Sequence, residues 1–417
     1  MRENEQILQK IITGQKIPLL AFVEPLLYGD YEREDFSVTE EEAFRDVKEC
    51  GFDIIVGAQY CLSKNREIII RILEQCEKQE LLYLIRDNES FADKTQEEAE
   101  DYFRKMYAPF LKYRSFAGIN PTDEPGYSAW EKVRKFRRAF HSVYPDKLYF
   151  VNLLQNYAPA WALPNGAENQ GDLKEDTDYD FYCQSYIKQA KPQFFCYDFY
   201  PFRGKYPVMK ERYFEQLETV QKYCSKENIP IWCFLQSCAF PEFGTFARVP
   251  SYEELLWQTN TSLCYGTKGF AYFCYWIPYD DENWFGAFTD IRGNKTITYE
   301  NGRLINLHIQ NLEKYFLRSK VCKVFRSNEI KEYETFDSMV QAQGEVIVSC
   351  LKDAEKEYIF VVNNSFEKRT EASLCCGKEV KAVTDVCNNM RHIIANGKAS
   401  VVLGKGEGKL FTVEKGN

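Results

Sequence analysis

Histidine is scarce in this chain, with three residues in 417: His141, His308 and His392. A zinc centre built on histidine and a Ser-His-Asp triad both need a histidine at the reacting centre. None of the three follows a strand-like apolar run, where such a residue would be expected. The sequence therefore argues against both kinds of centre.

Long apolar runs are also absent. No stretch is apolar over the roughly 20 residues that a membrane-spanning helix needs, and Met1 to Gln6 are polar, without the apolar segment of a signal peptide. The net charge of −9 is unfavourable for nucleic acids and anionic membranes. We therefore expect a cytoplasmic protein with no nucleic-acid or membrane partner, and the sequence is compatible with a homo-oligomer.

The 15 cysteines form no recognisable disulfide framework and no zinc motif. Several of them, such as Cys196, Cys233 and Cys274, lie inside apolar runs. Buried free thiols of this kind are typical of a reducing compartment. No metal and no cofactor is expected from this pattern.

Eight short apolar runs recur along the first three quarters of the chain, rich in β-branched and aromatic residues, as expected of strands buried on both faces. Helical segments separate them, and this alternation predicts a parallel sheet. Eight units favour closure into a (β/α)₈ barrel, and the lack of a Gly-x-Gly-x-x-Gly after the first run counts against a dinucleotide-binding fold. The runs are residues 17–23, 52–57, 81–85, 116–119, 148–153, 194–197, 229–235 and 269–275.

Four of the intervening segments open with a capping box, in which a Ser or Thr side chain accepts from the backbone three residues on and a Glu reaches back. The boxes pair Thr39 with Glu42, Thr95 with Glu98, Ser128 with Glu131 and Ser251 with Glu254. Further helical runs are expected at residues 66–78, 181–190, 211–225 and 301–316.

The pattern changes after about Leu317. Short strand-like runs separated by turns rich in Gly and Asn follow, which predicts a small antiparallel β-sandwich. We therefore predict two domains, a barrel over residues 1–316 and a sandwich over residues 317–417. The sandwich runs are residues 321–325, 345–350, 358–362, 371–374, 380–386, 399–403 and 409–413.

Carboxylates stand at the ends of two of the predicted barrel strands. Asp123 and Glu124 follow the fourth run, and Asp198 follows the sixth. The active site of such a barrel lies at the C-terminal ends of its strands, and cleavage of a glycosidic bond needs one protonated and one ionised carboxyl group. Crowding of the two groups among aromatic rings would raise the pKa of one of them.

Amides and aromatic side chains occupy the other strand ends. An amide offers a donor and an acceptor to sugar hydroxyls, and an aromatic ring offers an apolar face. Gln59, Asp87, Gln155 and Ser237 also lie at strand ends, with Tyr279 and Trp284 in the loop after the eighth run. We predict catalytic roles for Glu124 and Asp198, and substrate binding by Glu24, Arg86, Asp123, Asn152, Tyr200, Trp232, Gln236 and Trp276.

Each of these residues also has a structural interpretation. Asp123 can bond backbone amides in its turn, and Asp198 can be held by Arg86 or Arg203. Gln236 and Asn152 can satisfy loop backbone groups, and Trp232 and Trp276 can belong to the core. Their convergence on one face of the barrel nevertheless favours a carbohydrate-active site.

The Asp-Glu-Pro after strand four, the Trp-x-Phe-x-Gln-Ser run ending at Ser237 and the terminal sandwich together resemble a glycoside hydrolase related to clan A, similar to the β-galactosidases. Segments 358–365 and 404–411 are similar to the accessory sandwiches of such enzymes, and the resemblance covers nearly the whole chain. It implies that Glu124 is the acid/base. The clan's nucleophile is a Glu at the end of strand seven, where this chain has Gln236.

Two residues can supply the missing carboxylate. Glu242 lies six residues beyond Gln236, in the following loop. We predict Asp198 instead, because a strand-four and strand-six pair resembles the α-galactosidase clan. In that clan the strand-four group is the nucleophile and the strand-six group the acid, so the roles can also be reversed.

Three functions stay open at this point. The leading one is a cofactor-independent glycosidase acting on oligosaccharides or glycosides. Gln236 motivates a catalytically silent sugar-binding barrel. A Mg²⁺-dependent lyase or isomerase would use Glu24, Asp87, Asp123 and Asp198, although the scarcity of His and the lack of a strand-end Lys count against it.

Overall fold

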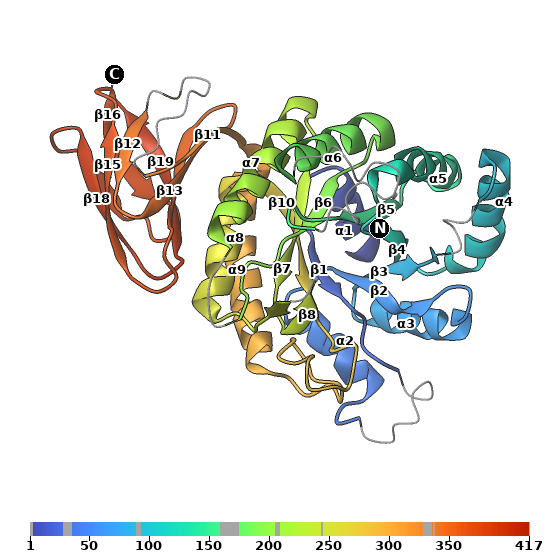
Figure 1. Ribbon diagram of the computed structural model, residues 1–417. Coiled ribbons are helices and arrows are strands. Elements are labelled where there is room, and N and C mark those ends of the chain that lie inside the picture. Colours follow the sequence, from blue (N-terminus) through green and yellow to red (C-terminus); the bar gives the residue numbers. More distant parts are fainter. Residues whose placement is uncertain are drawn as a thin grey trace. The chain divides into compact units, whose positions relative to one another are not determined.

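The computed structural model describes residues 3–27, 36–88, 93–158, 175–204, 209–242, 245–327, 336 and 338–416. Eight parallel strands close into a barrel in the order β1, β10, β7, β6, β5, β4, β3, β2 (Figure 1). The predicted (β/α)₈ barrel is therefore confirmed. Its strands are β1 (Leu19–Phe22), β2 (Ile54–Cys61), β3 (Leu82–Arg86), β4 (Phe116–Asp123), β5 (Leu148–Leu153), β6 (Phe195–Asp198), β7 (Ile231–Gln236) and β10 (Thr267–Phe273).

Helices alternate with these strands along the chain, and those between residues 40 and 227 lie around the barrel (Figure 1). The helices are α2 (Glu40–Glu49), α3 (Arg66–Lys78), α4 (Gln96–Tyr107), α5 (Trp130–Val143), α6 (Glu175–Ala190), α7 (Lys210–Glu227), α8 (Tyr252–Cys264) and α9 (Ile297–Arg318), with the unpredicted α1 (Glu3–Ile12) before β1. The segment after β7 forms a small hairpin, β8 (Phe240–Glu242) with β9 (Thr245–Ala247), which the sequence pattern did not reveal.

Three of the four predicted capping boxes are present, at Thr39, Thr95 and Ser251. The prediction at Ser128 and Glu131 is wrong. A 3₁₀ turn over Tyr127–Ala129 precedes α5, so the helix begins at Trp130 and its N-cap is Ala129, without a side-chain cap. The sequence pattern located the N-cap of this helix one residue too early.

The C-terminal part consists of two antiparallel sheets, as predicted for a β-sandwich. Between them lies a core that includes Val348, Val361, Ala372 and Leu374. Two strands, β12 and β17, were not predicted. The larger sheet has the order β11 (Lys320–Arg326), β13 (Val346–Lys352), β14 (Glu357–Asn363), β19 (Gly408–Lys415), β16 (Val380–Asp385) and β17 (Arg391–Ile393), and the smaller one β12 (Met339–Gln343), β15 (Thr370–Cys376) and β18 (Lys398–Leu403).

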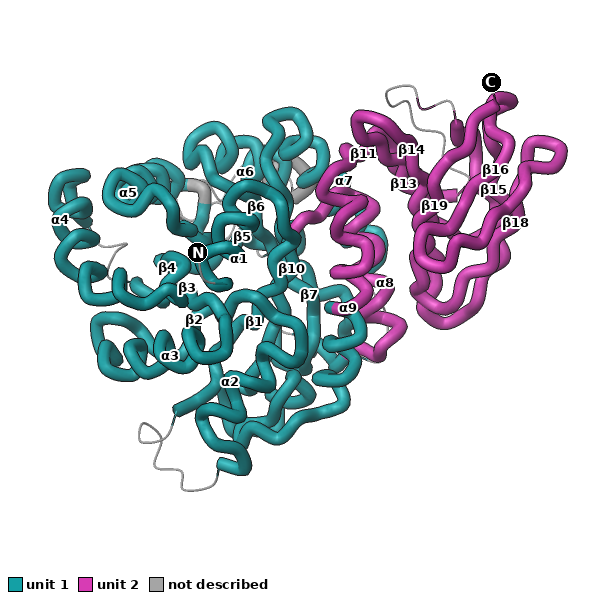
Figure 2. The backbone as a smooth tube through the Cα atoms, turned by 180° about the vertical axis from the view of Figure 1, so that it is seen from behind, with its two compact units in different colours: residues 1–249, 269–306 teal, residues 250–268, 307–417 magenta. Residues whose placement is uncertain are grey.

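The chain divides into two compact units (Figure 2), one comprising residues 1–249 and 269–306 and the other residues 250–268 and 307–417. The predicted boundary between residues 316 and 317 falls near the end of α9, whereas the second unit already includes α8 and most of α9. The two-domain division at 316 therefore stays a prediction. Among the described residues, no helix combines the length and the apolarity that crossing a membrane requires.

Candidate active site

Strands β4, β5, β6 and β7 are neighbours in the barrel and run parallel. Their C-terminal residues therefore meet at one edge. Asp123 is in register with Asn152, and Asp198 with Phe234. This arrangement brings the two predicted catalytic segments, after β4 and β6, to the same rim.

Glu124 follows β4 in a left-handed backbone conformation, with φ of 46°. A non-glycine residue rarely adopts this conformation, which persists only where the surroundings enforce it. Its N–H donates to the carbonyl of Asn152 at 3.0 Å, and Pro125 follows. The strand end thus holds the Glu124 side chain away from the regular alternation of β4.

Amide side chains connect the carboxylates. The Nδ2 of Asn152 donates to Asp123 Oδ1 at 3.3 Å and to Asp198 Oδ1 at 3.2 Å. The fully buried Gln155 lies among three carboxyl groups. In one orientation its amide nitrogen is 3.3 Å from Glu124 Oε1 and from Asp198 Oδ2, and in the other it is 3.4 Å from Glu242 Oε1.

The surroundings of Gln155 select one orientation of its amide. With the amide nitrogen toward Glu124 and Asp198, the nitrogen donates to both carboxyl groups and the amide oxygen faces donors. In the opposite orientation the amide oxygen would face only acceptors. Gln155 therefore links the two predicted catalytic groups through one donating nitrogen.

The environment of the rim raises the pKa values of its carboxyl groups. Burial, and then the charges of Asp123 and Glu242, raise the pKa of Glu124 to about 8. Burial also raises the pKa of Asp198 well above its ordinary value, with further contributions from Glu124, Glu242 and Asp123. Asp123 reaches solvent, yet the protein around it raises its pKa, an effect that Asn152 and Arg86 oppose.

Glu242, in the unpredicted hairpin, is the third carboxyl group. Its Oε2 pairs with the guanidinium of Arg203, and its Oε1 accepts from the Tyr157 hydroxyl at 2.8 Å. Burial raises its pKa, while Arg203 and Tyr157 oppose the rise. The structural interpretation of Asp198 had suggested Arg203 as its partner. Arg203 instead pairs with Glu242. Tyr157 was missed, because nothing in a loop tyrosine marks it in sequence.

Several predicted binding residues are engaged by the protein itself. Glu24 is fully buried and accepts from the N–H groups of Ala58, Gln59 and Tyr60 at 2.7–3.2 Å. The amide of Gln236 bonds the backbone of Phe202 in both directions and donates to the carbonyl of Arg248.

Both tryptophans predicted for substrate binding lie in packed surroundings. Trp232 is the second residue of β7, at the opposite end of the strand from Gln236, and stacks on Phe194 with ring centroids 3.7 Å apart. The structure therefore does not bring Trp232 to the rim. Trp276 is 1% exposed and packs near Phe36, and a Cβ on Gly293 would come within 2.6 Å of its ring.

Arg86 and Tyr200 remain at the rim. Arg86 donates to the carbonyl of Ala58 and lowers the pKa of Asp123. The N–H of Tyr200 donates at 3.3 Å to the Tyr157 hydroxyl that bonds Glu242. Burial, and then the charges of Asp198 and Glu242, raise the pKa of the Tyr200 hydroxyl well above its usual range.

The four carboxylates of the Mg²⁺ hypothesis are not brought together. Asp87 accepts from the hydroxyls of Tyr102 and Tyr107 at 2.7 and 2.6 Å, and Glu24 is occupied as described. Within the part of the chain that the structure describes, no group of three or more His, Cys, Asp or Glu is arranged to hold a metal ion.

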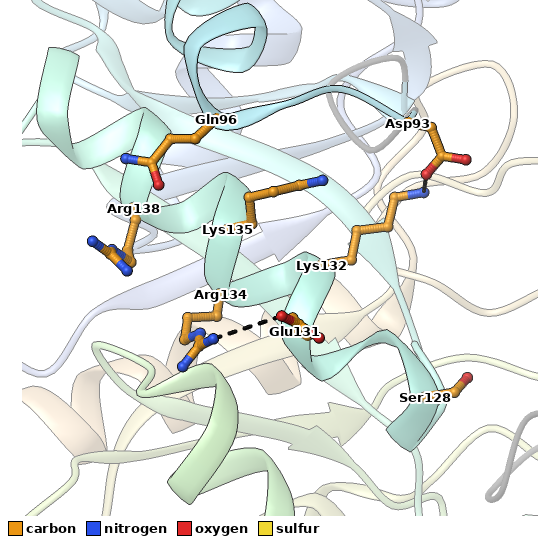
Figure 3. Close-up of a pocket in the computed structure, with 8 residues that line it drawn as sticks. All are labelled: Asp93, Gln96, Ser128, Glu131, Lys132, Arg134, Lys135 and Arg138. Carbon is orange, nitrogen blue, oxygen red and sulfur yellow. Dashed lines mark ion pairs between the residues drawn. The ribbon is translucent and has the colours of Figure 1, made fainter.

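A pocket of about 450 Å³ lies between the start of α4 and the outer face of α5 and is lined by none of these rim residues (Figure 3). Its charged groups are partly paired, Lys132 with Asp93 at 3.4 Å and Arg134 with Glu131 at 3.9 Å, and both acids are highly exposed. Exposed ion pairs of this kind contribute little to the stability of the protein. The pocket is lined by Asp93, Gln96, Ser128, Glu131, Lys132, Arg134, Lys135 and Arg138, none of which was predicted as a site residue.

The fold is a (β/α)₈ barrel followed by two antiparallel sheets, as the sequence resemblance implied. No protein-family model matches the chain, and no curated protein has a significantly similar sequence. Solved structures do match, at identities that show the fold alone.

The structure is similar to the β-galactosidase of Bacillus circulans sp. alkalophilus, with a TM-score of 0.64, 6% identity, and coverage of 95% of this chain and 99% of that one. A catalytic mutant of a GH42 β-galactosidase from G. stearothermophilus gives a TM-score of 0.62 at 8% identity, covering 95% and 98%. An α-amylase from Geobacillus thermoleovorans gives 0.54 at 9% identity, covering 97% and 99%. The resemblance to barrel glycoside hydrolases is therefore confirmed at the level of the fold, which by itself does not decide the chemistry.

Proposed function

We propose that the protein is a glycoside hydrolase that cleaves terminal sugars from oligosaccharides or glycosides with two carboxyl groups. The observation that carries this proposal is the Gln155 amide lying among Glu124, Asp198 and Glu242, with the pKa of Glu124 raised to about 8. A carboxyl group that stays protonated near neutral pH beside a second carboxyl group is what a general acid requires.

In this mechanism Glu124 donates its proton to the leaving-group oxygen, and Asp198 attacks the anomeric carbon as nucleophile. Glu124 then deprotonates the water that releases the sugar. Oxygens of Glu124 and Asp198 lie 3.3 Å from the same Gln155 atom, so they are at most twice that distance apart. This bound favours the retaining separation of about 5–5.5 Å over the inverting one of roughly 6.5–9.5 Å.

Glu242 supports the reaction through its charge. Its Oε2 is held in an ion pair with Arg203, whereas the donors to Asp198 are the uncharged amides of Asn152 and Gln155, which favours Asp198 as the group that reacts. Asp123, Asn152, Arg86 and Tyr200 border the reacting centre and would contact the sugar. Glu24 and Gln236, whose polar atoms the protein uses, would instead shape the loops around it.

The test is release of sugar from a panel of aryl α- and β-glycosides by the wild type, Glu124→Gln, Asp198→Asn and Glu242→Gln. We expect Glu124→Gln and Asp198→Asn to lose at least 100-fold in kcat. Azide should restore turnover of Asp198→Asn as the glycosyl azide of inverted anomeric configuration. Such rescue in Glu242→Gln alone would assign the nucleophile to Glu242.

The matched control is Glu131→Gln, which removes a highly exposed glutamate of α5 and should leave turnover unchanged. Full activity of Glu124→Gln on a substrate that the wild type cleaves would refute the proposal. Sugar binding without turnover across the panel would instead support the silent sugar-binding barrel.

A further inference from the structure

A continuous series of aromatic rings leads from the carboxyl groups to an exposed loop. Tyr200, whose N–H bonds the Tyr157 hydroxyl that in turn bonds Glu242, contacts Phe240 edge to face with centroids 5.1 Å apart. Phe240 stacks on Trp284 at 5.6 Å and 26°, and Trp284 meets Tyr279 at 5.1 Å. The series therefore begins at the reacting centre and ends at a ring that is 55% exposed.

Phe273, at the C-terminal end of β10, joins the series from the side. Its ring lies 5.3 Å from Tyr200, 4.8 Å from Phe240 and 6.0 Å from Trp284. Phe273 and Trp284 are only partly buried, and Tyr279 is largely exposed. Rings that merely completed the barrel core would be buried, as Phe240 is, so the outer rings present apolar faces to solvent.

The loop that carries the outer rings is anchored to the hairpin that carries Glu242. The backbones of Ala239 and Phe285 exchange hydrogen bonds of 2.9 and 3.3 Å. The side chain of Asp281 accepts from the Asn283 N–H at 2.7 Å, and its carbonyl accepts from the Trp284 N–H. The position of Trp284 relative to Glu242 is therefore set by backbone contacts.

The loop also carries a charge pattern. Asp280, Asp281 and Glu282 are consecutive and exposed, directly between the two outer rings. A negatively charged ligand would be repelled there. The surface suits a neutral ring that has an apolar face.

We propose that Trp284 and Tyr279 form a subsite for the leaving portion of the substrate, which binds a neutral ring such as a second sugar or an aryl aglycone. This inference rests on the proposed glycosidase function and narrows its substrate class. It excludes small alkyl glycosides and anionic leaving groups as preferred substrates.

The test measures binding in Glu124→Gln protein, where no cleavage interferes. The probes are phenyl, 4-carboxyphenyl and methyl 1-thioglycosides of galactose and glucose, each as α and β anomer, titrated by calorimetry. We expect the phenyl compound of the preferred sugar to bind at least threefold more tightly than the methyl compound. Trp284→Ala should remove that preference, Tyr279→Ala should reduce it, and Trp284→Phe should retain most of it.

The matched control is Phe181→Ala, which removes a ring that is also 55% exposed but lies on α6 and should leave the preference intact. Phenyl and methyl compounds that bind equally, or a preference that survives Trp284→Ala, would overturn the subsite. If the 4-carboxyphenyl compound bound more tightly than the phenyl compound, the preference of the subsite for a neutral ring would be refuted. Thioglycoside binding needs no bond cleavage, so the two proposals can fail separately. Unchanged turnover in Glu124→Gln would refute the glycosidase mechanism. A preference for the phenyl compound that depends on Trp284 would still support the subsite.

Discussion

At the scale of single residues, the rim is a place where negative charge is concentrated without an equal number of cations. Asp123, Glu124, Asp198 and Glu242 influence one another's pKa values, and Arg203 forms its ion pair with Glu242. Burying several carboxyl groups together is unfavourable for stability, so a rim built for stability alone would keep them apart. The left-handed backbone at Glu124 also indicates a functional site, because strain of this kind clusters at such sites.

The pH dependence of turnover should report on Glu124. Activity requires its protonated form, so kcat/KM should fall as pH rises through its pKa of about 8. Because the charge of Glu242 contributes to the raised pKa, Glu242→Gln should move this alkaline limb to lower pH. The pH profiles of wild type, Glu242→Gln and the control Glu131→Gln would check this. An alkaline limb that stays in place in Glu242→Gln would contradict the assignment of the limb to Glu124.

At the scale of elements, the sequence predicts most of what the backbone does. The eight barrel strands follow from apolar runs buried on both faces, and three helix starts follow from capping boxes. The prediction of a capping box at Ser128 was wrong because a 3₁₀ turn precedes the helix and can hydrogen-bond the same backbone N–H groups. The spacing of Ser and Glu alone does not reveal such a turn. The hairpin that positions Glu242 has three-residue strands, too short for a periodic signal.

The candidate site was predictable in part for the same physical reason. Strand ends are local features, so the position of Glu124, Asp198 and Asn152 at one rim of the barrel could be predicted. Whether a polar side chain faces substrate or protein depends on partners distant in sequence. Glu24 is held by residues 58–60, and Gln236 by residues 202 and 248. Trp232 was misplaced because a residue's position along a strand, and not its presence in one, decides which end of the barrel it reaches.

Gly118 tests how strongly the β4–β5 pairing sets the site. Its φ is 150°, and a Cβ there would lie 2.0 Å from the carbonyl oxygen of Leu148, its partner across the ladder. We expect Gly118→Ala to lower the free energy of unfolding by about 3 kcal/mol and to reduce turnover, because the same two strands carry Asp123 and Asn152. Urea unfolding and kcat would measure both effects.

Gly14 is the matched control for Gly118. It also has a positive φ, of 67°, but a Cβ there would meet nothing within 4 Å. Gly14→Ala therefore carries only the conformational cost of about 1 kcal/mol and should leave turnover unchanged. Equal effects of the two substitutions would mean that the close contact of β4 with β5 contributes nothing.

At the scale of the whole molecule, the second compact unit joins two helices of the barrel pattern to the C-terminal sheets. Residues 254 to 264 of α8 are all buried. The helix contacts β13 and β14. Trp257 donates to Asn364 at 3.2 Å, Asn260 donates to the carbonyl of Gly406 at 3.0 Å, and Phe316 of α9 meets Phe360 at 5.1 Å.

A chain ending at residue 316 would therefore not behave as an independent barrel. It would expose the faces of α8 and α9 that β13 and β14 cover, including Trp257 and Phe316, and leave Asn260 without its partner at Gly406. We expect the shortened chain to unfold at a lower temperature than the full chain and to associate, because an exposed apolar face of this kind favours aggregation. Full-length Ile393→Ser, which changes a residue that is 68% exposed on the sandwich, is the control and should match the wild type. Thermal unfolding and light scattering would measure both chains, and a monomeric 1–316 chain with the unfolding temperature of the full protein would show that the division between the domains lies at residue 316, as the sequence pattern alone indicates.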